Sequence, residues 1–239
     1  MDVRNRAQKE ALAAQGLARL LADERRELVA LLGNPPDVAN VPDAYWIALR
    51  DKLRRQLVNY AIIFYLLYQD DLSLALPALP VGVPNRQRRA AEFAASHADT
   101  IATRYTARTR DYLSQADPTG FDLDQLRRPM VPPDLSRRLV IATGPAVVER
   151  MAVGTVTGAS TRSHMDLDDQ FRAAGAQVSA IWRTEEDDRV CRVCGPLNGT
   201  SQDYWAARFP AGPGDEVHPN CRCWLESDVR MPGGRTGRF

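Results

Sequence analysis

The stretch HPNCRCW, His218–Trp224, decides how the end of this chain can fold. It holds two cysteines one residue apart, with a histidine three positions before the first. The other two cysteines lie shortly upstream in VCRVCGPLNG, Val190–Gly199, so that all four thiols of the 239-residue chain fall within one window of 33 residues. Thiols gathered in this way indicate a shared task for the C-terminal part of the chain.

The spacing of these residues suits a common metal ion. In the CxxC pair, Cys191 and Cys194, the two-residue gap lets both sulfurs face one centre from a tight turn. In the CxC pair, Cys221 and Cys223, residues two apart on an extended segment project to the same side, and His218 lies in the loop before them. Zinc takes four tetrahedral ligands from cysteine and histidine, so five candidates compete for four places. An all-cysteine site and a site of CxxC, His218 and one late cysteine are both open.

The same residues allow two other interpretations. From residue 185 onward the chain has few large apolar side chains and several glycines and prolines, and such a segment usually needs a staple. A zinc ion can contribute about 10 kcal/mol of folding free energy; two disulfides or four buried free thiols are the alternatives. The N-terminus is too polar for a secretory signal peptide, so we expect a reducing cytoplasm, where clustered cysteines more often bind metal.

Catalytic uses of the cysteines fit the sequence less well. A thioredoxin-like CxxC opens a helix after a strand, whereas this one runs into the turn Asn198-Gly199. His218 could activate a thiol, yet the sequence indicates neither a third group nor a substrate pocket. A catalytic zinc keeps one coordination place open for water, and five available ligands favour a closed site. We therefore expect a structural centre and no enzymatic activity.

The region before the cysteines changes from helical to strand-like patterning. Residues 177–184 alternate apolar and polar, with Val178, Ala180 and Trp182 on one side, which predicts a strand. Helices are predicted earlier, ending at Gly and Pro breaks: one through Leu32, then 43–70, 85–115, 135–153 and 166–175. A small-residue stretch, 154–165, separates the last two, and Pro-rich connections are predicted at 76–85 and 117–134.

These elements predict an α+β fold, in which a long, mainly α-helical N-terminal region precedes a small C-terminal strand-and-loop module stapled by the Cys/His cluster. The expected domains are a helical region, 1–134, a domain with both cysteine motifs, 135–228, and a loose tail, 229–239, with little to bury. Arg222 is expected to pair with Asp187 or Asp188 across the sheet.

Composition bears on the possible partners. The net charge of +1 gives no global field toward nucleic acid or an acidic membrane. The stretch Arg86–Arg110 holds six arginines against Glu92 and Asp99, which suits DNA phosphates, an acidic partner or a solvated helix face. The longest apolar run, Tyr60–Tyr68, has nine residues, short of the roughly 20 that span a bilayer. It predicts a core helix or a surface that docks on another chain.

In order and spacing, the C-terminal motifs resemble the phage Mu F-like head morphogenesis family, the minor head proteins of tailed phages. The family pattern is a strand ending in Trp and Thr, an Asp, CxxC, Leu-x-Gly and a closing HPNCRC. The matching positions here are Trp182, Thr184, Asp187, Cys191, Cys194, Leu197, Gly199, His218, Pro219, Asn220, Cys221, Arg222 and Cys223. The resemblance covers about Trp182–Leu225, and the Thr-Glu pair usual upstream of the strand does not occur in residues 154–165.

The resemblance implies a structural minor head protein that acts in head (procapsid) morphogenesis. It implies the phage portal protein as partner, with the major capsid protein or scaffold and packaged DNA as further partners, no membrane, and several copies per head. The implied location is the host cytoplasm during assembly and then the capsid interior near the portal vertex. Some relatives carry an enzyme domain after the motif, for which the sixteen residues after Cys223 leave no room.

The alternative function is a zinc-stabilised nucleic-acid-binding protein. Such a module needs a basic surface around its metal. The acids at 185–188 stand beside Cys191 and would repel phosphate. The sequence therefore favours the assembly role.

Overall fold

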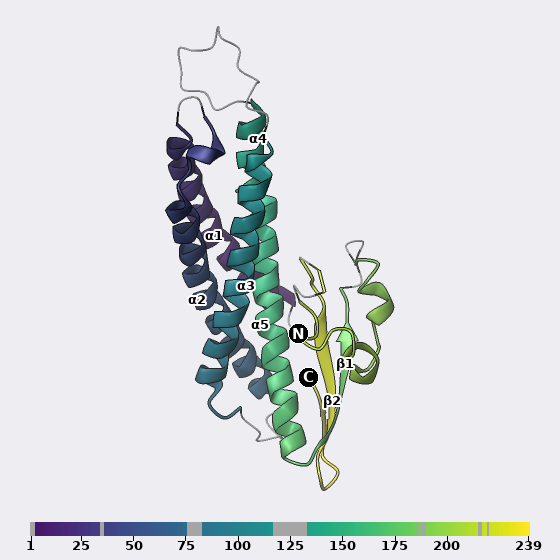
Figure 1. Cartoon of the computed structure of the whole chain (residues 1–239). Coiled ribbons are helices and arrows are strands. Elements are labelled where there is room, and N and C mark those ends of the chain that lie inside the picture. The colour runs from purple at the N-terminus through teal and green to yellow at the C-terminus, as the bar shows by residue number, and fades with distance from the viewer. Residues whose placement is uncertain are drawn as a thin grey trace.

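The computed structural model describes residues 3–33, 36–75, 83–116, 133–185, 187, 190–214, 217–218 and 220–239. Long helices run side by side, and a small sheet lies against one of them (Figure 1). The helices are α1 (Val3–Leu31), η1 (Val38–Asn40), α2 (Asp43–Ala75), α3 (Arg86–Ser114), α4 (Pro133–Ala142) and α5 (Pro145–Ala173). Then come β1 (Gln177–Arg183), η3 (Gly195–Leu197), α6 (Gln202–Trp205), β2 (Trp224–Arg230) and β3 (Thr236–Arg238). The predicted α+β class, with a long helical region before a small strand-and-loop module, is confirmed.

The first helices form because apolar residues recur at three- and four-residue spacing. Leu17 and Leu21 of α1 and Leu53 and Leu57 of α2 are completely buried, and they join side chains of α3, α4 and α5 in one hydrophobic cluster. The chain leaves α1 at Gly33, whose φ of +78° is readily adopted only by glycine. The predicted ends of the first three helices agree with the structure to within a few residues.

The apolar run Tyr60–Tyr68 lies inside α2 and is mainly a core segment. Phe64 and Tyr65 are buried within the hydrophobic cluster shared by the helices. On the opposite side of the same stretch, Ile63 and Leu67 are 45% and 43% exposed. The run therefore fills the core and also leaves a narrow apolar strip on the surface.

The boundary between the last two long helices differs from the prediction. The chain breaks at Thr143 and Gly144, inside the predicted helix 135–153. Pro145 occupies the first turn of α5, where its fixed φ and missing N–H are tolerated. A Cβ at position 144 would lie only 2.5 Å from the carbonyl oxygen of Val140, so the tight corner between α4 and α5 requires glycine.

The small-residue stretch 154–165, predicted to separate two helices, instead lies within the continuous helix α5. Gly158 allows α3 to approach closely, because a Cβ there would lie 2.7 Å from the ring of His97. On another side of α5, a Cβ at Gly212 would come within 2.8 Å of Thr161. The small residues therefore mark a helix that is packed closely by its neighbours, and the sequence prediction was wrong on this point.

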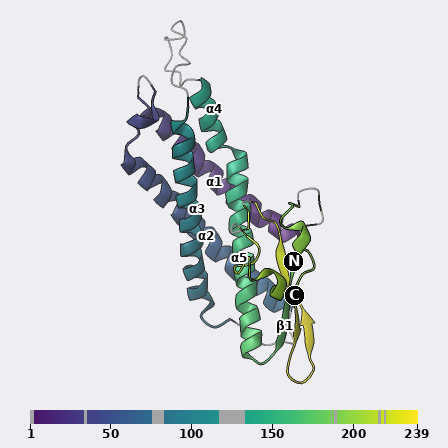
Figure 2. The ribbon, with the colours of Figure 1, turned by 45° about the vertical axis from the view of Figure 1, so that its right-hand side comes forward.

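The sheet is antiparallel with the strand order β1-β2-β3. Its register places Trp182 opposite Leu225 and Ala180 opposite Ser227. These four residues are buried, which confirms the predicted inward side of the first strand. Both views of the ribbon show α5 between the other long helices and the sheet (Figures 1 and 2), so α5 contributes to both parts of the fold.

Residues 229–239, predicted to be a loose tail, are instead built into the sheet. The strand β3 pairs with β2, and the backbone of Phe239 exchanges two hydrogen bonds with Ser227, at 2.8 and 3.1 Å. The Phe239 ring lies 4.7 Å from the ring of His164 and 5.6 Å from that of Phe171. The terminal aromatic side chain therefore closes the space between the sheet and α5.

The helical part and the cysteine-containing part share their packing. The large hydrophobic cluster contains Leu113 from one side of the predicted domain boundary at 134/135 and Leu135 from the other. One window within Asp134–Ala173 is apolar and long enough to cross a membrane, and 61% of it is buried inside the protein, as in a core helix. The predicted connections at 76–85 and 117–134 fall mostly outside the described residues.

Candidate metal centre

The CxxC segment is positioned by the end of β1. The Trp182 N–H donates to the carbonyl oxygen of Thr200 at 2.9 Å, and the Gly199 N–H donates back to the Trp182 carbonyl at 2.8 Å. Gly199 has a φ of +79°, which lets the chain reverse there at little cost. The turn that follows CxxC is thus held against the first strand, and the two cysteines lie beside the sheet.

The CxxC segment itself forms a tight turn around a sulfur atom. The Cys194 N–H donates to Sγ of Cys191 at 3.3 Å, and the Gly195 N–H donates to the Cys191 carbonyl at 2.9 Å. Backbone N–H groups directed at a sulfur stabilise its thiolate form. This is the local arrangement that the two-residue spacing predicts.

The structure brings all five predicted residues together. The possible ligand atoms of Cys191, Cys194 and His218 lie within 4.8 Å of one another, and so do those of Cys194, Cys221 and Cys223. Cys194 belongs to both groups: its sulfur lies 3.0 Å from Nε2 of His218 and 4.0 Å from Sγ of Cys221. All four cysteines are free thiols. The Cys/His cluster could therefore hold a metal ion.

The distance between the Cys194 and Cys221 sulfurs agrees with tetrahedral coordination. Two sulfurs bound about 2.3 Å from a tetrahedral zinc lie roughly 3.8 Å apart, close to the 4.0 Å between Cys194 and Cys221. The three cysteines of the inner group, Cys194, Cys221 and Cys223, are 5% exposed or less, whereas Cys191 and His218 are half-buried. The cluster thus has a buried sulfur side and an outer side that an ion could reach.

The environment acts differently on the individual thiols. Hydrogen bonds with Cys194 and then with Cys223 lower the pKa of Cys221, and the hydrogen bond with Cys221 is the main cause that raises the pKa of Cys194. Burial of Cys191 opposes its ionisation, but the N–H groups of Cys194 and Val193 outweigh it and lower the pKa of that thiol. Cys221 and Cys191 are thus the thiols whose ionisation the surroundings favour, and thiolates are the form that binds metal.

The cluster stands in a hydrophobic setting that the sequence prediction missed. Trp182 and Trp205 are 0% and 1% exposed, and their rings meet edge to face with centroids 5.6 Å apart. Leu197 and Leu225 pack with them and with the three buried cysteines. The sequence analysis expected few large apolar side chains from residue 185 onward and did not foresee that Trp205 of α6 would pack against Trp182 of β1.

The CxC segment is tied to the long helices by two polar side chains. The Thr157 hydroxyl of α5 donates to the Cys221 carbonyl at 2.6 Å. From α1, the Arg6 guanidinium donates to the Arg222 carbonyl at 2.6 Å and to the Thr157 oxygen at 2.8 Å. Arg6 is only 5% exposed. Sequence reasoning did not identify either residue, since nothing local connects position 6 with a motif more than two hundred residues away.

Two arginines next to the CxC segment are paired with acids, whereas Arg192 of the CxxC segment is exposed. Arg222 forms an ion pair with Asp187, which confirms one of the two predicted pairings; Asp188 lies outside the described residues. Arg6 pairs with Glu10 at 2.8 Å and lies 4.0 Å from Glu185. The two arginines closest to the CxC segment are thus neutralised by carboxylates.

A second buried polar group lies farther along the sheet, where the sequence analysis placed no site. The Ser227 hydroxyl donates to Asp168 at 2.9 Å and lies 2.9 Å from Nε2 of His164. Burial raises the pKa of Asp168 to about 7 and lowers that of His164 to about 3. The i, i+4 spacing of His164 and Asp168 on one helix was the available signal. Ser227 of β2 bridges His164 and Asp168 of α5, and Phe239 covers His164. The group therefore holds the sheet to α5.

Comparisons with protein-family models, with curated proteins and with solved structures found no match to this chain.

Proposed function

We propose that this chain is a structural minor head protein of a tailed phage whose C-terminal module is stabilised by zinc. The observation that carries the proposal is the convergence of Cys191, Cys194, His218, Cys221 and Cys223 at the edge of the sheet, in the motif order described above. The proposed action is in procapsid assembly, with the portal protein as partner. The capsid protein or scaffold and packaged DNA are the further partners.

The chemistry of the donor set supports zinc. Soft thiolates and imidazole favour zinc over magnesium or calcium, which prefer oxygen ligands. Cys194 belongs to both groups of ligand atoms. A four-ligand site that contains Cys194 can therefore draw its other ligands from Cys191 and His218, from Cys221 and Cys223, or from both pairs. When bound, the ion supplies a cross-link between the turn after β1 and the start of β2.

The protein's own contribution is to hold the CxC segment in place from outside. Thr157 and Arg6 bind the carbonyl groups of Cys221 and Arg222, and the tryptophan pair fills the space behind the sulfurs. Second-sphere contacts of this kind fix ligand orientation. In this arrangement the centre joins the module to α1 and α5, which gives a rigid body suited to assembly.

Two features support a structural rather than catalytic or nucleic-acid-binding role. Five donors are available for four coordination places, which leaves none for an activated water in a closed site. Binding of phosphates requires free positive charge, and the two arginines next to the CxC segment, Arg222 and Arg6, are paired with Asp187 and Glu10. The assembly role requires neither an activated water nor free positive charge at the cluster.

Two measurements test the proposal separately. Protein purified under reducing conditions is assayed for metals and for reactive thiols before and after chelation; about one zinc per chain, with thiols that become reactive on chelation, is expected. Absence of bound metal, or thiols equally reactive at the start, would contradict the metal centre.

The assembly role is tested with the portal protein encoded by the same phage genome. Co-expression followed by sedimentation should recover this chain with portal rings and procapsids. A DNA-retention assay and an assay of procapsids lacking portal protein are run in parallel. Recovery with free DNA but not with portal or procapsids would favour the alternative, a zinc-stabilised nucleic-acid-binding protein.

A further inference from the structure

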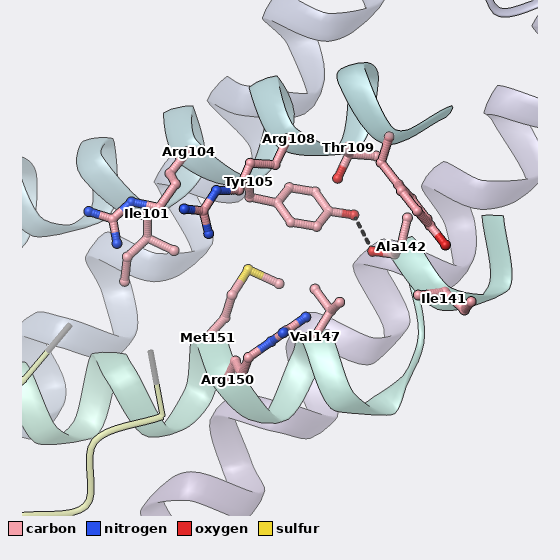
Figure 3. A pocket seen from close by; sticks show the side chains of 11 residues that line it. Ile101, Arg104, Tyr105, Arg108, Thr109, Ile141, Ala142, Val147, Arg150 and Met151 are labelled. Atoms are coloured by element: carbon pink, nitrogen blue, oxygen red, sulfur yellow. Dashed lines mark hydrogen bonds between the residues drawn. The ribbon is translucent and has the colours of Figure 1, made fainter. Parts of the chain in front are cut away.

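A slot lies between α3 and the junction of α4 with α5, away from the metal centre (Figure 3). Its volume is about 320 Å³. Ile101, Ala142 and Met151 are buried at its floor, and the half-buried Tyr105 and Val147 line its sides. The Tyr105 hydroxyl donates to the Ala142 carbonyl at 3.0 Å, so its polar end is satisfied and its ring is available as an apolar wall.

Three arginines stand around this slot. Arg104 and Arg108 come from α3, one turn apart, and Arg150 comes from α5 (Figure 3). None of the residues that line the slot is acidic, and within the described part of the chain none of these three guanidinium groups forms an ion pair. The contrast is clear nearby, where Arg110 pairs with Asp43 at 2.7 Å and Arg138 with Asp134 at 2.8 Å.

This combination restricts the chemistry of a ligand. A phosphate backbone would use the arginines but leave the apolar floor uncovered, and a neutral apolar molecule would bury the floor while leaving three like charges unpaired. Guanidinium groups form strong bidentate pairs with carboxylates. A segment that carries several carboxylates beside large apolar side chains satisfies both parts of the site.

The apolar surface continues beyond the slot. Ile141, at its rim, is 51% exposed, and the adjacent Val140 is 52% exposed. Exposed aliphatic side chains next to a hollow are typical of contact surfaces, and they extend the site along α4 past the reach of a compact small molecule. A peptide segment that lies along the groove therefore fits this extent.

We propose that this slot docks an acidic, apolar segment of a partner protein. Two large apolar side chains of that segment fill the floor between Tyr105 and Met151, and its carboxylates pair with Arg104, Arg108 and Arg150. The proposal does not depend on the metal centre or on a role in head assembly. It uses a different face of the protein and different residues.

Selection from a random displayed peptide library tests the proposal on the full-length protein. Enriched peptides should combine Asp or Glu with Leu, Ile, Phe or Trp. A synthetic peptide of the enriched consensus is then measured by fluorescence anisotropy. The triple variant Arg104→Gln, Arg108→Gln, Arg150→Gln should weaken binding about tenfold or more, and Ile141→Ser should weaken it less.

The matched control is Arg19→Gln, Arg55→Gln, Arg88→Gln, which makes the same change in net charge at exposed positions outside the slot. It should leave the affinity within about twofold. If both triple variants weakened peptide binding equally, the loss of affinity would come from net charge alone, and the proposal would be overturned. Enrichment of neutral or basic peptides, no enrichment, or binding of a DNA duplex or of laurate that the consensus peptide does not displace would also overturn it.

Discussion

The guanidinium group of Arg6, near the start of the first helix, donates a hydrogen bond of 2.6 Å to the backbone carbonyl of Arg222, the residue between the two cysteines of the CxC motif. The same guanidinium binds the Thr157 hydroxyl, which donates to the Cys221 carbonyl. One buried cation thus connects α1, α5 and the start of β2. The cysteine cluster is held from behind by the long helices as well as by its own loops.

Replacing Arg6 by Met should destabilise the protein, because the Arg222 carbonyl and the Thr157 hydroxyl lose a buried partner. Loss of such a charge-assisted contact costs about 1–3 kcal/mol, measured as a lower free energy of unfolding in urea. Arg19→Met, on the exposed side of the same helix, is the control and should be close to neutral. Equal stability of the two variants would show that Arg6 does not anchor the motif.

The position of Cys194 in both groups of ligand atoms gives the second prediction. Cys194→Ser should abolish metal binding, because it removes the one ligand that belongs to both groups. Cys191→Ser should only weaken it, because Cys194, Cys221 and Cys223 stay together and His218 lies next to Cys194. Trp182 and Trp205 report on the module, since both are buried beside the sulfurs. Chelation or Cys194→Ser should therefore shift tryptophan emission to the red while far-UV circular dichroism keeps most of its helical signal. Equal zinc content in the two variants would argue against a shared central ligand.

Much of this architecture could be predicted from local patterns. The Gly and Pro breaks predicted where α1 ends and α2 begins, the alternation around Trp182 predicted β1, and the cysteine spacing predicted that five donors would meet. The patterns failed where long-range packing decides the conformation. Residues 154–165 have the composition of a connection, but their small side chains serve close contacts with His97 and with the loop at Gly212. The tail is ordered because Phe239 finds an aromatic site on α5.

The buried group formed by His164, Asp168 and Ser227 predicts a specific pH dependence. Because the folded-state pKa of Asp168 is raised to about 7, the folded protein holds that proton better, and its contribution to stability falls as pH rises from about 4 to about 7. His164, with its pKa lowered to about 3, acts in the opposite sense as pH falls below about 6.5. Above pH 7 His164 is neutral in both the folded and the unfolded protein, so of these two groups only the buried charge of Asp168 lowers the free energy of unfolding.

Asp168→Asn removes that cost while keeping an oxygen that can accept from Ser227. The variant should be more stable than the natural protein at pH 8, and the advantage should shrink by roughly 2 kcal/mol on going to pH 5. Denaturant unfolding at both pH values measures the difference. Asp169→Asn, at the neighbouring exposed position, is the control. If the stability of both variants changed with pH in the same way, Asp168 would not be the cause of the pH dependence.

The C-terminal aromatic residue should contribute to stability although it ends the chain. Phe239→Ala uncovers His164 and leaves space next to Phe171, so a loss of about 1–3 kcal/mol is expected for this partly buried ring. Arg235→Ala, at the exposed turn before β3, should have a much smaller effect. Thermal unfolding of both variants makes the comparison. A negligible effect of Phe239→Ala would restore the original expectation of a loose tail.

The contact between Gly158 and His97 leads to a prediction that opposes helix propensity. In an ordinary helix, Gly→Ala stabilises by about 1 kcal/mol. Here the added methyl would lie 2.7 Å from the His97 ring, which is stacked on Phe93 at 4.9 Å between centroids and has little room to move. Gly158→Ala should therefore destabilise the protein, by about 1–3 kcal/mol.

A double-mutant cycle separates this steric cause from other effects. His97→Ala alone should be destabilising because it leaves a cavity, but in its presence Gly158→Ala should become neutral or stabilising, so that the two changes are strongly non-additive. Gly195→Ala is the control, since a Cβ there meets only Val190 at an ordinary 3.8 Å. If Gly158→Ala stabilised the natural protein, α3 and α5 could not be as closely packed at this point as the structure places them.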